Sequence, residues 1–175
     1  MPTLKPDAAL EAGQLENPII EFMHVAEIDS IFGVPTYEQL REATGYDDGK
    51  RTQRLKTWGR TPKVLVDDPH WIGVRNGTAY HVDTGYPRYT YQLKILVDEP
   101  THVRGWDRVR FPLSRGLFYT LDTHSPHQVV APKGGEYWNV SLSWDSHELV
   151  DREAVLKELV AYAKRTDIYG NPTPS

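Results

Sequence analysis

The sequence of 175 residues contains no cysteine. This absence excludes disulfide bonds, thiolate-based zinc sites, iron–sulfur clusters and a cysteine nucleophile. Long apolar runs are also absent, because no stretch approaches the run of about 20 apolar residues that crosses a bilayer. The N-terminal residues MPTLKPDAALEAG have no apolar core of signal-peptide length. We therefore expect a cytoplasmic protein without a membrane partner.

The chain has no excess of positive charge. Its formal net charge is −4 and its pI is near 6.0, which gives no electrostatic footprint for binding nucleic acid, so no nucleic-acid partner is expected. Aromatic residues are plentiful, with ten tyrosines and five tryptophans, which suits a β-rich domain with packed sheet faces. The length predicts a single domain over residues 1–175.

The pattern along the chain predicts short strands with flanking helices. Thr36 is an expected N-cap and Gly45 an expected stop for the helix within TYEQLREATG. Asn76-Gly77 lies between two strand-like arms and is a strong hairpin signal. Further short strands, separated by turns with proline and glycine, predict a β-sandwich or a small barrel. The expected parts are an N-terminal arm at 1–16, a first strand at 17–25, a β core at about 60–145 and a C-terminal helix at about 147–165.

Two of the expected strands have one polar and one apolar face, because successive side chains of a strand point to opposite sides. Either the polar faces meet water, as in many antiparallel sheets, or they line a concave pocket while the apolar faces pack under helices. In RYTYQLKI the polar face carries Arg88, Thr90, Gln92 and Lys94. In EYWNVSLSW the polar face carries Tyr137, Asn139, Ser141 and Ser143, and the apolar face carries Trp138, Val140, Leu142 and Trp144.

Two motifs carry candidate metal ligands. His81 and Asp83 form a His-x-Asp triplet, which chance alone supplies readily. The later stretch GLFYTLDTHSPHQVVAPKGGEYWNVSLSW contains a glycine turn, an apolar strand, a short turn with His127 and a further strand. Together the two motifs resemble the Fe(II)- and 2-oxoglutarate-dependent oxygenases, and most closely their aspartyl/asparaginyl β-hydroxylase and free-proline hydroxylase branch. The resemblance covers roughly residues 70–145 and implies a double-stranded β-helix, which is a jelly-roll or cupin-like fold.

The resemblance also implies a metal centre made of His81, Asp83 and His127, which would be the catalytic residues. Two neutral imidazoles and one carboxylate on one face of iron(II) leave three positions open, two for 2-oxoglutarate and one for dioxygen. 2-Oxoglutarate is then decarboxylated to succinate, and a C–H bond of an amino acid or peptide side chain is hydroxylated. The three donor atoms are expected to lie roughly 3 Å apart, as ligands of one ion do. His124 lies on the same turn and is the less favoured candidate for the third position.

The sequence departs from this family where the far carboxylate of 2-oxoglutarate would bind. Members usually carry an arginine or lysine on the strand after the distal histidine, and Tyr137 stands there instead. A buried dicarboxylate needs a cation. Lys94 is preferred, because Jumonji-type and factor-inhibiting asparaginyl hydroxylases place a lysine near this position, and Arg88 is the second choice. The other expected contacts of the cosubstrate are Thr90, Gln92, Tyr137 and Asn139.

Two other interpretations stay open. One is a cupin-like enzyme that uses another metal, or iron without 2-oxoglutarate. The other is a non-enzymatic jelly-roll module that serves in binding or assembly. The arginine-rich segment DEPTHVRGWDRVRFPLSR is expected to border the pocket, which favours a small-molecule or peptide substrate that carries a carboxylate.

Overall fold

The computed structural model describes most of the chain. The expected N-terminal arm, residues 1–16, lies outside the described residues. The described residues are 17–44, 52–57, 70–75, 77–84, 87–105, 110–132 and 138–165. The elements are β1 (Ile19–His24), α2 (Ile28–Phe32), α3 (Tyr37–Thr44), β2 (Thr52–Thr57), β3 (His70–Arg75), β4 (Tyr89–Val97), β5 (Thr101–Gly105), β6 (Arg110–Leu113), β7 (Leu117–Asp122), β8 (His127–Val130), β9 (Trp138–Ser146) and α4 (Arg152–Arg165).

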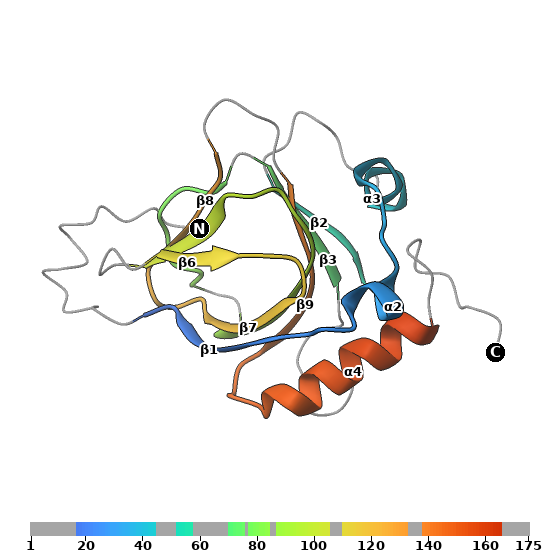
Figure 1. The fold of residues 1–175 in the computed structure, drawn as a ribbon. Helices are drawn as coiled ribbons and strands as arrows, with labels where there is room; N and C mark the ends of the chain where they lie inside the picture. The colour runs from blue at the N-terminus through green and yellow to red at the C-terminus, as the bar shows by residue number, and fades with distance from the viewer. Residues whose placement is uncertain are drawn as a thin grey trace, which may run out of the picture.

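The strands form two antiparallel sheets that curve toward each other (Figure 1). The larger sheet has the order β1-β7-β4-β9-β3-β2, and the smaller sheet has the order β6-β5-β8. A short segment before β4 extends the smaller sheet, because Thr78 N donates to Val129 O at 2.9 Å and His81 N donates to His127 O at 3.0 Å. From β3 onward the chain therefore passes back and forth between the sheets, which is the topology of a jelly roll. The fold class expected from the sequence is confirmed.

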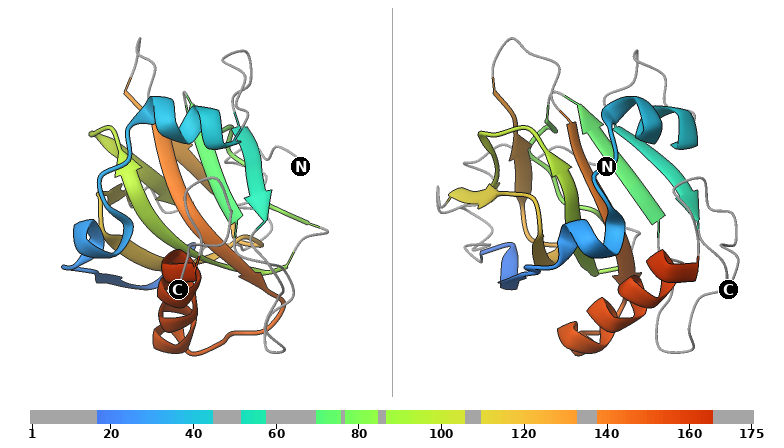
Figure 2. Two further views of the ribbon diagram at one scale, coloured as in Figure 1. Left: turned by 90° about the vertical axis from the view of Figure 1, so that its right-hand side faces the viewer. Right: turned by 45° about the vertical axis from the view of Figure 1, so that its right-hand side comes forward.

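Helices cover the outer face of the larger sheet (Figure 2). Along β4 the alternate residues Tyr91, Leu93 and Ile95 are fully buried against them. Burial of each such side chain contributes about 1.5–3 kcal/mol to stability. The apolar side of β4 thus packs under helices, as the pocket interpretation of the strand pattern requires. The same core contains Val140, Leu142 and Trp144 of β9 and Val155, Leu159 and Tyr162, which share one face of α4.

In the first part of the described chain, β1 and α3 match the local sequence signals. The expected strand at 17–25 is β1, which pairs with β7 and so widens the larger sheet beyond the expected core. α3 begins with a reciprocal capping box, in which Gln39 N donates to Thr36 Oγ1 at 3.1 Å and Thr36 N donates to Gln39 Oε1 at 2.9 Å. The expected stop at Gly45 lies outside the described residues. Short α2 was not predicted from the sequence.

The C-terminal helix begins later than expected. The sequence predicts it over about residues 147–165, whereas α4 begins at Arg152. The reason is a local cap, because the Asp151 carboxylate accepts a hydrogen bond of 3.3 Å from Ala154 N and so satisfies a donor that the first turn leaves unpaired.

The expected hairpin at Asn76-Gly77 is wrong. β3, which precedes it, pairs with β2 and β9 in the larger sheet, whereas the segment that follows pairs with β8 in the smaller sheet. Asn76 lies outside the described residues, and Gly77 has a φ of 71°. A Cβ atom at Gly77 would collide with the backbone oxygen of Val129. Glycine is needed here because the chain crosses between the sheets with backbone in contact with backbone.

The Gly77→Ala substitution should therefore destabilise the fold by about 2–4 kcal/mol, because it adds both left-handed strain and a steric collision. Gly33→Ala is the control for a positive φ without a collision, since Gly33 has a φ of 66° but no atom within 4 Å of a Cβ, and its backbone strain alone should cost about 1–3 kcal/mol. Urea unfolding of both variants measures the difference. Equal losses of unfolding free energy in Gly77→Ala and Gly33→Ala would contradict the close approach of Gly77 to the backbone of Val129.

Candidate metal centre and its cavity

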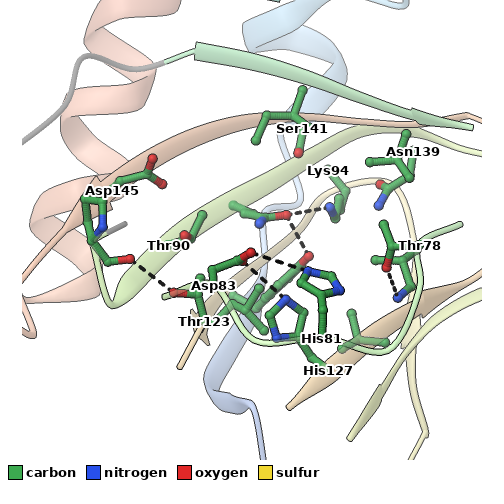
Figure 3. A pocket seen from close by; sticks show the side chains of 18 residues that line it. Thr78, His81, Asp83, Thr90, Lys94, Thr123, His127, Asn139, Ser141 and Asp145 are labelled. Atoms are coloured by element: carbon green, nitrogen blue, oxygen red, sulfur yellow. Dashed lines mark hydrogen bonds and ion pairs between the residues drawn. The ribbon is translucent and has the colours of Figure 1, made fainter. Parts of the chain in front are cut away.

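A cavity of about 290 Å³ lies between the two sheets, with a wall built from both (Figure 3). The polar faces of β4 and β9 point into it. The pocket interpretation of the strand pattern therefore holds for these two strands, and the alternative, in which their polar faces meet bulk water, does not. β4 contributes Thr90, Gln92 and Lys94, and β9 contributes Asn139, Ser141 and Asp145.

The structure brings His81, Asp83 and His127 together at this cavity. His81 and His127 hold each other by two backbone hydrogen bonds across the small sheet, of 3.0 and 2.9 Å, and their ring centroids lie 4.4 Å apart. Asp83 Oδ1 lies 3.5 Å from His81 Nε2, and Asp83 Oδ2 lies 3.6 Å from His127 Nε2. One donor atom from each of the three lies within 4.8 Å of the others. The separations from Asp83 are slightly longer than the expected value of roughly 3 Å.

Backbone contacts fix the orientation of both imidazoles. His81 Nδ1 lies 2.6 Å from Ala79 O, and His127 Nδ1 lies 2.8 Å from Ser125 O. A carbonyl oxygen only accepts, so each Nδ1 carries a hydrogen, and each Nε2 lies on the side of Asp83. Burial, and then the neighbouring His127 ring, lower the pKa of His81 and favour its neutral form.

These three side chains suit a bound cation. When both imidazoles are neutral, three groups that only accept lie together, and Asp83 Oδ1 is buried with no hydrogen-bond partner among the described residues. Buried polar atoms are normally satisfied, and a divalent metal would satisfy this oxygen and both imidazole nitrogens together. Backbone carbonyls that hold the Nδ1 hydrogens are also the usual outer partners of metal-binding histidines.

Lys94 is a buried cation in the same cavity. Its side chain is 1% exposed, and Nζ donates a 2.8 Å hydrogen bond to Gln92 Oε1. The Tyr119 hydroxyl donates to the same oxygen at 2.8 Å, and the Tyr119 ring centroid lies 5.2 Å from Nζ. Burial lowers the pKa of Lys94 from 10.5 to about 7. In the described part of the chain Lys94 forms no ion pair, so a bound anion would supply the partner that stabilises its protonated form.

Arg88 is not a cation of this cavity, and its expected role as the second choice for the cosubstrate is corrected. Its side chain is 45% exposed and forms an ion pair with Asp122, with a distance of 2.9 Å between Nη2 and Oδ2. Arg88 precedes β4, so the alternation that directs Thr90 inward does not extend to it.

Three of the four remaining expected contacts of the cosubstrate lie in the cavity wall. Thr90, Gln92 and Asn139 line the cavity. Asn139 is 3% exposed, and its Oδ1 atom has no hydrogen-bond partner among the described residues. Tyr137 lies outside the described residues. His124 is exposed, unlike His127, and is not part of the three-residue group.

Sequence reasoning missed Asp145, which is nearly buried in the cavity wall. The signal was present, because Asp145 continues the inward alternation of Asn139 and Ser141 along β9. In the register of the sheet Asp145 is opposite Thr90, and Ser141 is opposite Lys94. Figure 3 accordingly shows Asp145 and Thr90 on one side of the metal-ligand candidates and Lys94 and Asn139 on the other. The cavity thus has an acidic end and a basic end.

No helix in the described part of the chain is both long enough and apolar enough to cross a membrane.

Comparisons with known proteins give little further information. No protein-family model matches the sequence, and no curated protein matches it. Among solved structures, a cupin 2 domain-containing protein from Halorhodospira halophila is similar with a TM-score of 0.39 and 18% identity, over 75% of this chain and 90% of that chain. The jelly-roll assignment rests on the strand order and register of the protein itself.

Proposed function

We propose that the protein is an Fe(II)- and 2-oxoglutarate-dependent hydroxylase that acts on an amino acid or a peptide side chain. The observation that carries the proposal is the composition of one cavity. It holds a group of three acceptors suited to a metal and, apart from it, the buried ammonium group of Lys94. A metal alone would not need this cation, whereas an anionic cosubstrate would.

His81, Asp83 and His127 are the residues that would hold the iron. Two imidazoles and one carboxylate leave open positions on Fe(II), the arrangement that non-haem oxygenases use. When bound, iron and 2-oxoglutarate supply the oxidative chemistry, with succinate and carbon dioxide as products beside the hydroxylated substrate. The protein's own part is to keep both Nε2 atoms free of hydrogen, through Ala79 O and Ser125 O.

Lys94 would bind the far carboxylate of 2-oxoglutarate. Its burial makes the ion pair strong, because little water screens it. The Ser141 hydroxyl and the Asn139 amide lie at the same end of the cavity and can add hydrogen bonds. Before the cosubstrate binds, Gln92 holds Lys94 Nζ in position, because the Gln92 side-chain oxygen accepts hydrogen bonds from both Lys94 and Tyr119. Burial raises the pKa of Tyr119, so its hydroxyl remains a donor.

The space beside Thr90 and Asp145, at the other end of the cavity, would remain for the substrate (Figure 3). A carboxylate on the substrate remains a prediction, because it rests on the segment 98–115, of which residues 106–109 lie outside the described residues.

Conversion of 2-oxoglutarate to succinate tests the proposal. Protein loaded with Fe(II) should form succinate in air, slowly without substrate and faster with an amino acid or peptide that is hydroxylated. Lys94→Met should remove this activity, while Lys157→Met, at an exposed lysine of α4, should not. Metal binding without succinate formation would favour a metal-dependent jelly-roll enzyme that does not use 2-oxoglutarate. Absence of metal binding as well would favour a non-enzymatic module.

A further inference from the structure

The turn between β7 and β8 contacts two of the three proposed metal ligands through its backbone. Thr123 O accepts a hydrogen bond of 2.8 Å from Asp83 N. Ser125 O lies 2.8 Å from His127 Nδ1 and fixes the orientation of that ring. Any movement of this turn would therefore displace both Asp83 and His127.

Asp122 closes the turn with its own polar groups. Its carboxylate Oδ1 accepts from His124 N at 3.1 Å, and its carbonyl accepts from Ser125 N at 3.1 Å. This is the local pattern by which an aspartate side chain mimics a backbone turn. The turn is thus shaped by a residue that does not face the metal-ligand candidates.

Arg88, which lies just before β4, binds the Asp122 carboxylate at the end of the neighbouring strand β7. Arg88 Nη2 donates at 2.9 Å to Oδ2, and Nε lies 3.2 Å from both carboxylate oxygens. The Asp122 side chain is 6% exposed, and a buried carboxylate needs a charged partner of this kind. The backbone adds a second link, because Arg88 O accepts from Thr123 N at 2.8 Å and from Thr123 Oγ1 at 3.0 Å.

We propose that Asp122 and Arg88 are positioning residues of the metal centre, which act on Asp83 and His127 through the carbonyls of Thr123 and Ser125. The inference rests on the metal centre of the proposed function, but not on 2-oxoglutarate. It gives Arg88 a role that its sequence pattern did not indicate. The planar guanidinium of Arg88 binds the Asp122 carboxylate through two nitrogens, Nε and Nη2, and so fixes its orientation. A lysine ammonium group does not bind a carboxylate in this way.

Co(II) affinity of the metal-free protein, followed by visible absorption, tests the positioning role. Outer partners of metal ligands commonly contribute 10–100-fold to affinity. Arg88→Gln should therefore weaken Co(II) binding about tenfold, and Asp122→Ala about 10–100-fold. Asp122→Asn should lie between the parent and Asp122→Ala, because an amide oxygen still accepts from His124 N but no longer attracts Arg88. Arg88→Lys should restore only part of the affinity.

Arg115→Gln is the matched control, since Arg115 pairs with Asp29 and with Gly33 O, away from the turn. It should leave Co(II) affinity within about twofold, even if it lowers the melting temperature as much as Arg88→Gln does. Equal effects of both arginine variants on Co(II) affinity would overturn the positioning role. Parent protein that binds Co(II) but not 2-oxoglutarate would overturn the proposed function and leave the positioning role standing. Parent protein that does not bind Co(II) would overturn both.

Discussion

Replacement of Lys94 with methionine should raise the stability of the protein and, in the same variant, remove binding of 2-oxoglutarate. Folding removes the Lys94 amino group from bulk water, which lowers its pKa from 10.5 to about 7. The folded state therefore bears the cost of a buried charge at neutral pH. Methionine has a similar length and no charge, so the variant should gain about 2–4 kcal/mol and roughly 5–10 °C in Tm. Thermal unfolding measures this gain.

The same substitution removes the only cation that we assign to the far carboxylate of 2-oxoglutarate. A charged hydrogen bond in a dry pocket contributes a few kcal/mol, so the apparent Kd for 2-oxoglutarate should rise about a hundredfold or more. Metal affinity should change little, because Lys94 is not among the three donor residues. Lys157→Met serves as the control for loss of one positive charge. A Lys94→Met protein that is destabilised, or that binds 2-oxoglutarate like the parent, would contradict this assignment.

The lowered pKa of Lys94 predicts how the stability gain of Lys94→Met and the affinity for 2-oxoglutarate change with pH. The unfolded chain keeps this proton up to about pH 10.5 and the folded chain only up to about pH 7. The cost of the buried charge is therefore full below pH 7 and fades as the pH rises toward 10.5. The extra stability of Lys94→Met should fade over the same range. Affinity for 2-oxoglutarate should fall by up to tenfold per pH unit above pH 7, because binding then requires Lys94 to regain its proton.

Replacement of His127 with alanine should weaken divalent-metal binding by about a thousandfold. The His127 ring supplies one of three donors, and each donor of a metal site with few protein ligands contributes several kcal/mol. His124→Ala is the control, because His124 is exposed and its backbone N–H, which contacts Asp122, is retained. Titration of the metal-free variants with Co(II) gives both affinities. A larger loss in His124→Ala than in His127→Ala would mean that the third ligand is misassigned.

Local rules were enough to predict the faces of the central strands and the start of one helix. Strict alternation in β4 separated Tyr91 and Leu93, which are in the core, from Gln92 and Lys94, which line the cavity, but it left open whether the polar face met water or a pocket. The capping residue Thr36 acts on its immediate neighbours, so its signal is complete within one turn. At Gly77 the local signal was misleading, because a turn sequence does not reveal which strand each arm will pair with.

The metal-ligand candidates were predictable because they belong to a recognisable motif. The role of Arg88 was not, because it depends on a residue that is distant in the sequence. His81, Asp83 and His127 were found through a family resemblance, since nothing in their spacing alone brings them together. Arg88 looked equivalent to Lys94 in the strand pattern. The difference arises from Asp122, which lies far along the chain and becomes the neighbour of Arg88 only after β4 and β7 pair.

Anaerobic addition of Fe(II) and then 2-oxoglutarate to the metal-free protein tests the central claim most directly. The account predicts a weak visible charge-transfer band that requires both additions, is missing in His127→Ala, and is missing in Lys94→Met at the same concentration of 2-oxoglutarate. Parent protein that binds Fe(II) yet develops no band at saturating 2-oxoglutarate would contradict the claim that this cavity holds the two together.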